Sequence, residues 1–294
     1  MRRVFSLPAL LVLLSCFAAP IAAAQTWHPI AAAKTPGSSL FLLTSEGQVV
    51  ALNLTASSGS VVGHFAFHIL GNPVDMTMGT FNSQPALFIA SNNVVSGVPQ
   101  GRIVAFTTEG RRIADWPFQG LVGGLTFDIP SQTLYFSSGS EPDVYQLSPQ
   151  PGARPQRVAS VSGAQKLGPL AIGPKHERLF LSDAQGDIYF MGIAGSAHRV
   201  GPLGHTRVPQ AVLVSPSAQV LYIADSGTGQ IVALPAGPKM PAVSPNFTPP
   251  GSFPNPSGLA WLDPAHLIVA DQRNGSVYIV DLSGKIVATI PLSQ

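Results

Sequence analysis

The sequence predicts an all-β protein built as a six-bladed β-propeller, in which each blade is a four-stranded antiparallel sheet. Three observations lead to this prediction. Short apolar segments recur six times at spacings of 42 to 47 residues. The chain has 29 glycines and 28 prolines but only 10% charged residues, as expected for many short strands joined by tight turns. No long amphipathic segment with the 3.6-residue period of a helix interrupts this pattern.

The N-terminus has the three parts of a secretory signal peptide. Arg2 and Arg3 form a positive start, an apolar run follows, and Ala22-Ala23-Ala24 provides small residues for cleavage. The apolar run is too short for a comfortable membrane span and is interrupted by prolines. We therefore expect a signal peptide at 1–24, one propeller domain at 25–294, and export to the periplasm or the extracellular space.

Cys16 is the only cysteine, and it lies inside the predicted signal peptide. Two interpretations compete. In the first, Cys16 is a small apolar residue that is removed with the signal. In the second, Leu13-Leu14-Ser15-Cys16 resembles a bacterial lipobox, and Cys16 would carry a lipid anchor. The stretch Phe17–Ala24 favours the first, because it is typical of the end of a cleaved signal and not of a polar tether.

The charge balance excludes several partners. The chain has 16 basic and 14 acidic residues, and cleavage after Ala24 would remove two arginines and no acid, leaving 14 of each. A neutral, sparsely charged surface lacks the basic patch that phosphate backbones require. We therefore expect neither nucleic acid nor an anionic membrane surface as a partner. Separately, we expect no membrane span in the mature protein and a monomeric state.

The repeat defines the strands of each blade. A first strand is clear in several blades, as in 124–127, and a fourth follows in several, as in 286–290. The second strand is the most continuously apolar, which is typical of a strand buried on both faces. Its central residues are Phe41, Phe88, Tyr135, Phe180, Tyr222 and Ile268. The third strand follows a turn residue, which in the six blades is Gly47, Gly101, Pro142, Gly186, Gly229 and Gly275. Stacking six such sheets around an axis buries faces that one sheet alone leaves exposed.

Two segments depart from the simple repeat, and the ends of the chain raise the question of how the ring closes. Residues Asn92–Gln100 lengthen the connection between the second and third strands of blade 2. The proline-rich segment Lys239–Ser257 is expected to cross from blade 5 to blade 6 without regular structure. Because the last blade supplies all four of its strands from the C-terminal end, we expect Trp27–Ala33 to close the ring by packing against blade 6.

Two connections between second and third strands point to a known family. Val269-Ala270-Asp271-Gln272-Arg273-Asn274-Gly275-Ser276-Val277-Tyr278 resembles an NHL repeat, and 223–231 is similar. Leu181-Ser182-Asp183 is a weaker copy, and blades 1 to 3 lack the aspartate. The resemblance implies a six-bladed propeller. It implies little about activity, since the fold serves binders and enzymes alike.

The repeated aspartates are the first candidates for a site. They would converge on the face that carries the turns between second and third strands, where oxygen ligands could hold Ca²⁺. The alternative, favoured by their repetition, is that each caps its own turn through backbone N–H groups. The candidate ligand-binding residues on this face, including neighbours from the loops between blades, are Asn92, Asp183, Asp225, Asp271, Arg207 and Asn255. No metal-ligand set can be assigned.

The sequence contains no recognisable catalytic set. It has no G-x-S-x-G elbow, P-loop or dinucleotide fingerprint. Our first hypothesis is an exported, non-catalytic binding or scaffold propeller that presents loops to a protein, peptide or glycan, without a cofactor. The alternative is a metal-dependent hydrolase or lactonase of the gluconolactonase-like kind with a divergent site and bound Ca²⁺. That family takes a glutamate ligand from the first blade, but Trp27–Ala33 contains no acid.

Overall fold

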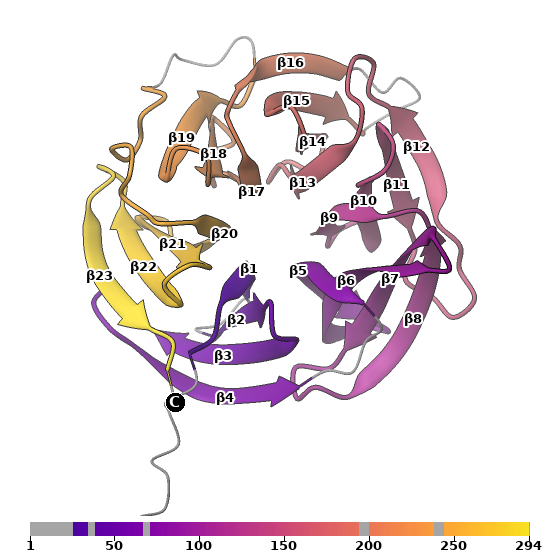
Figure 1. Cartoon of the computed structure of the whole chain (residues 1–294), viewed down its shortest axis with the longest axis horizontal. Helices are drawn as coiled ribbons and strands as arrows, with labels where there is room; N and C mark the ends of the chain where they lie inside the picture. The colour runs from indigo at the N-terminus through magenta and orange to yellow at the C-terminus, as the bar shows by residue number, and fades with distance from the viewer. Residues whose placement is uncertain (1–25, 35–38, 67–70, 194–199, 238–243, 294) are drawn as a thin grey trace, which may run out of the picture.

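The computed structural model describes residues 26–34, 39–66, 71–193, 200–237 and 244–293. Its sheets surround a central axis, with β1, β5, β9, β13, β17 and β20 nearest to it (Figure 1). The first three blades contain β1 (Pro29–Lys34), β2 (Ser39–Thr44), β3 (Gln48–Leu54), β4 (Gly59–Ala66), β5 (Asn72–Phe81), β6 (Gln84–Val95), β7 (Val98–Phe106), β8 (Arg112–Gln119), β9 (Val122–Asp128), β10 (Thr133–Ser138), β11 (Asp143–Leu147) and β12 (Gln156–Ser160).

The last three blades contain β13 (Leu167–Ile172), β14 (Arg178–Asp183), β15 (Asp187–Gly192), β16 (Val200–His205), β17 (Pro209–Val214), β18 (Val220–Asp225), β19 (Gln230–Pro235), β20 (Pro256–Asp263), β21 (His266–Asp271), β22 (Ser276–Asp281) and β23 (Ile286–Pro291). Each sheet pairs its strands antiparallel in chain order. The predicted fold is therefore confirmed: an all-β, six-bladed propeller whose blades mostly have four antiparallel strands.

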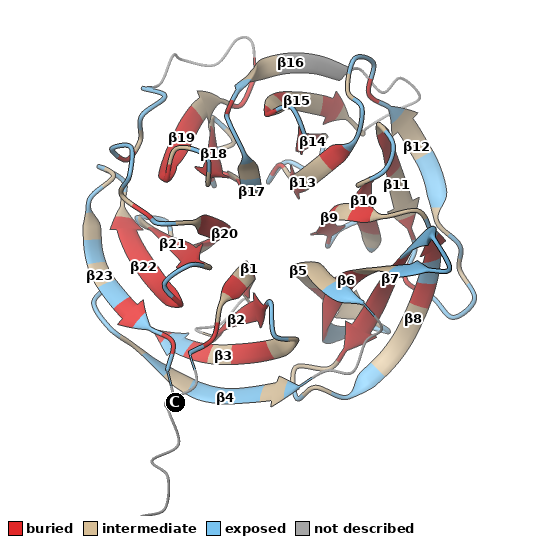
Figure 2. Cartoon of the chain, viewed as in Figure 1, coloured by how far each residue is buried: buried red, intermediate tan, exposed pale blue. Residues whose placement is uncertain are grey.

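The core is divided into six buried clusters within the described residues, one between each pair of neighbouring blades. Alternate residues of a strand enter different clusters. Leu40 and Leu42 of β2 pack toward blade 6, while Phe41 and Leu43 pack toward blade 2. This follows from the two-residue period of a strand, which sends successive side chains to opposite faces. It explains why the second strands are apolar throughout and why burial is concentrated in the middle of each blade (Figure 2).

The ring closes through the N-terminal residues, as expected. The backbone N–H of Trp27 donates to the carbonyl of Leu292 at 3.1 Å, and that of Leu292 donates to Gly275 at 2.7 Å. The side chain of Trp27 is 1% exposed and packs among residues of blades 1 and 6, including Ile279 and Ile290. Blade 6 takes β20 to β23 from one continuous stretch, so no strand is exchanged between the ends of the chain.

Blade 5 has three strands within the described residues. In place of a fourth strand, the proline-rich segment runs beside β19. Val232 forms an isolated bridge with Asn246, and the N–H of Ala233 donates to the carbonyl of Pro245 at 3.0 Å. Proline lacks the backbone N–H that a regular β-ladder needs. The segment therefore makes isolated hydrogen bonds to β19 in place of a continuous series. Residues 238–243 of this segment lie outside the described residues.

The insertion in blade 2 is an ordered hairpin. β6 and β7 pair along their whole length out to Val95 and Val98, and Ser96 and Gly97 make the turn with positive φ of 52° and 81°. Val94, Val95 and Val98 near its tip are exposed. The predicted lengthening of this connection therefore extends both strands.

The predicted signal peptide at 1–24, with Cys16, lies outside the described residues. No helix in the described part of the chain is long and apolar enough to cross a membrane.

Candidate functional site

Asp183, at the end of β14, caps the turn to β15. Its Oδ1 accepts hydrogen bonds from the backbone N–H groups of Gln185 and Asp187, both at 2.9 Å. Its Oδ2 accepts from the hydroxyl of Tyr189 at 3.2 Å. Burial, together with the charge of Asp183, raises the pKa of Tyr189 to about 12, so this hydroxyl stays a donor. The carboxylate is 2% exposed and is used within its own turn.

Asp225 and Asp271 occupy the equivalent position in blades 5 and 6 and cap two segments at once. Asp225 accepts from the N–H of Gly227 in its own turn at 3.0 Å and from the N–H of Arg207 at 3.1 Å. Asp271 accepts from the N–H of Arg273 at 3.0 Å and from that of Asn255 at 2.8 Å. Because Arg207 and Asn255 precede the first strands of these blades, each carboxylate ties a blade's turn to its inner strand.

These hydrogen bonds also explain the electrostatics of Asp225. Burial acts to raise its pKa, but the backbone N–H groups of Val208, Arg207 and Gly227 and the hydroxyl of Thr228 stabilise the charged form, and the pKa is lowered overall. The structure thus brings Asp225 together with Arg207, and Asp271 with Asn255, through backbone contacts. The side chain of Arg207 is exposed, and the amide of Asn255 donates to Gln272 at 3.1 Å.

Asn92 makes a different contact, from blade 2 to blade 3. Its side-chain amide donates to the carbonyl of Val122 at 2.8 Å, and its Oδ1 accepts from the N–H of Val122 at 2.8 Å. Both polar atoms of the amide are therefore engaged by the first residue of β9. Like the three aspartates, Asn92 holds backbone segments together.

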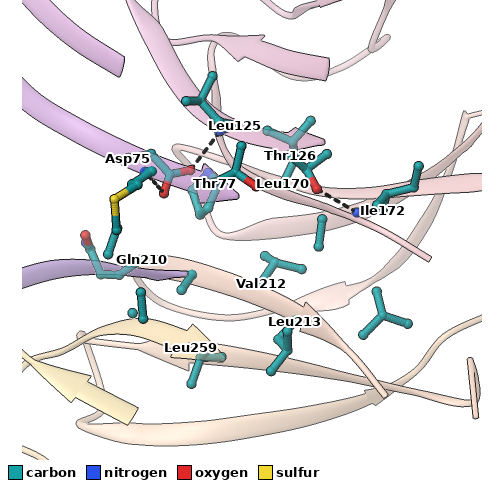
Figure 3. Close-up of a pocket in the computed structure, with 18 of the residues that line it drawn as sticks. Asp75, Thr77, Leu125, Thr126, Leu170, Ile172, Gln210, Val212, Leu213 and Leu259 are labelled. Carbon is teal, nitrogen blue, oxygen red and sulfur yellow. Dashed lines mark hydrogen bonds between the residues drawn. The ribbon is translucent and has the colours of Figure 1, made fainter. Parts of the chain in front are cut away.

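A cavity of about 340 Å³ lies on the propeller axis, and none of the six candidates from the sequence lines it. It is lined by the inner strands, and its surface is about equally polar and apolar. Leu170, Val212 and Leu259 border it (Figure 3), although their side chains belong to the buried clusters between blades. The lining also includes Pro174 and Pro216, which lie in the turns between first and second strands. The cavity thus extends toward the face opposite to the one that the repeated aspartates indicate.

Asp75 is the one ionisable residue among those that line this cavity. It lies on β5, where its Oδ2 accepts from the backbone N–H of Leu125 on β9 at 2.7 Å and its Oδ1 from the N–H of Met76 at 2.7 Å (Figure 3). Among the described residues, no arginine, lysine or histidine is within ion-pair distance of it. Burial raises its pKa to about 7, although the two backbone hydrogen bonds oppose the shift.

Uncharged polar groups complete the lining. Gln210 at the start of β17 is exposed to the cavity, and Thr77 follows Asp75 on β5 (Figure 3). Two others serve neighbouring backbone: Thr126 Oγ1 accepts from the N–H of Ile172 at 3.3 Å, and Ser257 Oγ donates to the carbonyl of Pro29 at 2.6 Å. The inner strands of adjacent blades do not pair with each other, which leaves backbone N–H and C=O groups along their edges without strand partners. Side chains such as those of Thr126 and Ser257 form hydrogen bonds with some of these groups.

Four histidines each face a carboxylate elsewhere on the molecule. Their Nδ1 atoms lie 2.5 to 3.0 Å from the acid oxygens, in the pairs His28–Glu46, His176–Asp128, His205–Asp187 and His266–Asp263. Within the described residues, no group of three or more histidine, cysteine, aspartate or glutamate side chains is arranged to hold a metal ion.

The sequence pattern does not single out Asp75, because the repeated aspartates mark the turns of blades 4 to 6 and blade 2 has no such residue. One signal was present: within Asn72-Pro73-Val74-Asp75-Met76-Thr77-Met78 an acid stands inside an inner strand, whereas the ionisable residues of the other inner strands, Lys34, Asp128 and Asp263, stand at the strand ends. Only the tertiary structure, in which Asp75 lines the axial cavity, shows that this acid reaches the axis.

Comparison with known proteins supports the fold class and goes no further. No protein-family model and no curated protein matches the sequence. Solved structures that resemble it include a functionally unknown protein from Desulfotomaculum acetoxidans (12% identity, 89% of this chain and 85% of that chain, TM-score 0.61). A protein from Bacteroides uniformis proposed to be a 6-phosphogluconolactonase is similar (12% identity, 90% of this chain and 87% of that chain, TM-score 0.62). A chain of the nidogen/laminin complex is also similar (14% identity, 86% of this chain and 93% of that chain, TM-score 0.63). The chain is a six-bladed propeller, and identities this low show the fold alone.

Proposed function

We propose that this protein is an exported, non-catalytic binding propeller of NHL-like construction that takes up its ligand at the axial cavity. The observation that carries the proposal is the contrast between two sets of polar groups. The repeated aspartates cap turns, because their carboxylate oxygens accept hydrogen bonds from backbone N–H groups; they are Asp183, Asp225 and Asp271. In the cavity, Gln210 and Thr77 make no side-chain hydrogen bond to another described residue, and Asp75 has no cation beside it.

The cavity has the composition of a ligand site. Its volume of about 340 Å³ is within the range of small-molecule pockets, which combine apolar walls with a few polar groups that fix orientation. The walls come from all six inner strands, so the packed blades hold the pocket in shape. A rigid scaffold around a partly polar cavity favours recognition of a small ligand, or of a side chain or sugar presented by a peptide or glycan.

A substitution that fills the cavity tests this proposal. Gln210→Trp replaces an exposed lining residue and should block the pocket without disturbing the core. Gln156→Trp on the outer strand β12 is the matched control, since Gln156 is exposed and far from the lining in the fold. A fragment library of mixed charge is screened against the wild-type protein by ligand-observed NMR. Hits that bind to the wild type and to Gln156→Trp but not to Gln210→Trp support the proposal; hits unaffected by Gln210→Trp contradict it.

The alternative hydrolase has one observation in its favour. A carboxyl group with a pKa near neutrality in a pocket has the property that a general acid or base needs. Assays with lactone and ester substrates, with and without added Ca²⁺ or Zn²⁺, decide between the two. Turnover that requires metal and disappears in Asp75→Asn would replace the binding proposal with the enzymatic one.

A further inference from the structure

The inner strands leave one charge on the axis. In the six inner strands the ionisable residues are Lys34, Asp75, Asp128 and Asp263. Of these only Asp75 lines the cavity, because the Nζ of Lys34 donates to the carbonyl of Leu262, Asp128 faces His176, and Asp263 faces His266. The pocket therefore presents a carboxyl group to a ligand with no competing charge in its lining.

The elements packed against Asp75 supply no cation either. β6 and β2 contain no ionisable residue, and β1 and β9 contribute only Lys34 and Asp128, both engaged elsewhere. An ionised carboxylate in such a place has two backbone N–H donors but no counter-charge to offset the hydration it has lost, which disfavours the charged form. Two things relieve it: a proton, or a cationic group brought by a ligand.

The carboxylate also has room for such a group. Each oxygen accepts one backbone hydrogen bond, whereas an ionised carboxylate has about four lone-pair sites. These two bonds fix the orientation of the side chain on β5. Leu125, Leu170, Val212 and Leu259 supply apolar parts of the same cavity, and Gln210 and Thr77 add uncharged polar groups (Figure 3).

We infer that the axial cavity selects a ligand that carries a protonated amine on an apolar body, with the ammonium group bound by the Asp75 carboxylate. This inference rests on the proposed function and specifies its ligand class. Because burial favours the protonated form of the carboxyl, the same contact makes binding depend on pH. A proton and the ammonium group compete for the same carboxylate. Binding of the amine therefore lowers the pKa of Asp75, and a fall in pH weakens the binding of the amine.

Three probes with one ring system and different end groups test the charge preference: tryptamine, its alcohol counterpart tryptophol, and indole-3-propionate. At pH 8 we expect tryptamine to bind at least tenfold more tightly than the other two. At pH 5.5, with Asp75 mostly protonated, tryptamine binding should weaken by up to about 30-fold while tryptophol binding is unchanged. Calorimetry at pH 7 in two buffers of different ionisation enthalpy should show release of about half a proton per tryptamine bound.

Asp75→Asn keeps the size of the side chain and removes its charge. It should abolish both the preference for tryptamine and its pH dependence, while tryptophol binding is retained. The pH series on the wild-type protein needs no variant and decides the question even if Asp75→Asn does not fold. Hexylamine and the capped peptide acetyl-Gly-Lys-Gly-amide, whose only ammonium group is on the lysine, distinguish a free amine from a lysine side chain presented by a peptide, and binding of either supports the inference.

Equal affinity for the three indole probes, a preference that survives in Asp75→Asn, or no binding by any of the amines would overturn the inference. The proposed function fails separately. If neutral or anionic fragments bind and Gln210→Trp blocks them, the cavity is a ligand site and only the amine specificity is wrong.

Discussion

The carboxylate of Asp75 on β5 accepts a hydrogen bond from the backbone N–H of Leu125 on β9 at 2.7 Å, which links the inner strands of blades 2 and 3. The same side chain faces the axial cavity. A single acid thus serves the backbone of the neighbouring blade and supplies the charge of the candidate site. The effect of Asp75 on stability and its effect on ligand binding can be measured separately.

The raised pKa of Asp75 predicts a pH-dependent contribution to stability. Between about pH 4, where the carboxyl group titrates in the unfolded chain, and about pH 7, the folded state holds a proton that the unfolded state has lost. Stability from this residue is therefore highest at the acidic end and is lost as the pH rises to 7. The loss is at most about 4 kcal/mol, since one pKa unit corresponds to about 1.36 kcal/mol.

Urea unfolding of the wild-type protein and Asp75→Asn across pH 4 to 8 measures this term. The difference in unfolding free energy between the two should change with pH in the stated direction and level off above pH 7. Glu109→Gln is the control, because Glu109 is fully exposed and its pKa is lowered. Parallel profiles for wild type and Asp75→Asn would contradict the prediction.

Trp27 closes the ring, so its truncation should weaken the contact between blades 1 and 6. Trp27→Ala removes a large buried side chain and is expected to cost about 3–5 kcal/mol of unfolding free energy. Trp27→Phe should cost much less, since the buried Nε1 has no hydrogen-bond partner among the described residues. The comparison is made by urea unfolding. Similar losses for both variants would mean that the indole N–H, and not the packed ring, stabilises the closure.

The capping role of Asp225 predicts a loss of stability without a change in metal response. Asp225→Ala leaves the N–H groups of Arg207, Val208 and Gly227 without their acceptor and should cost about 1–3 kcal/mol. Asp187→Ala is the milder control, because the Asp187 carboxylate is about half exposed and faces only His205. Thermal unfolding with Ca²⁺ or with EDTA should be the same for the wild-type protein. A rise in melting temperature with Ca²⁺ that Asp225→Ala abolishes would instead favour the metal-site interpretation.

Gly284 tests the packing of the proline-rich segment against blade 6. Its φ is +84°, and a Cβ at this position would clash with the carbonyl oxygen of Phe247. Gly152 has a similar φ of +77° but open space around it. Alanine at Gly152 therefore measures the cost of the left-handed backbone alone, about 1–2 kcal/mol. Gly284→Ala should cost about 1–3 kcal/mol more. If the alanine variants at Gly284 and Gly152 lose the same unfolding free energy, the backbone at Phe247 moves away from the new Cβ without a measurable cost.

The sequence alone predicts the propeller because each blade is encoded locally. The repeat places a strand such as Leu40–Leu43 or Leu267–Ala270 at near-constant spacing, and a strand that is apolar on both faces must be covered on both. The capping of turns by Asp183, Asp225 and Asp271 was also open to prediction, since an aspartate after a strand bonds to N–H groups two or three residues ahead. These features depend on short stretches of chain.

What only the tertiary structure decided is which polar groups reach the axis. The contacts between Asp75 and Leu125, and between Asn92 and Val122, join residues 50 and 30 positions apart. They depend on the register of each sheet and on the stacking of neighbouring blades, and no local pattern contains that information. The face that carries the repeated aspartates is the one that the sequence indicates, whereas the cavity extends toward the opposite face. A residue that caps a turn can recur wherever the same local geometry recurs, as in blades 4 to 6, but a site on the axis needs one residue in one blade.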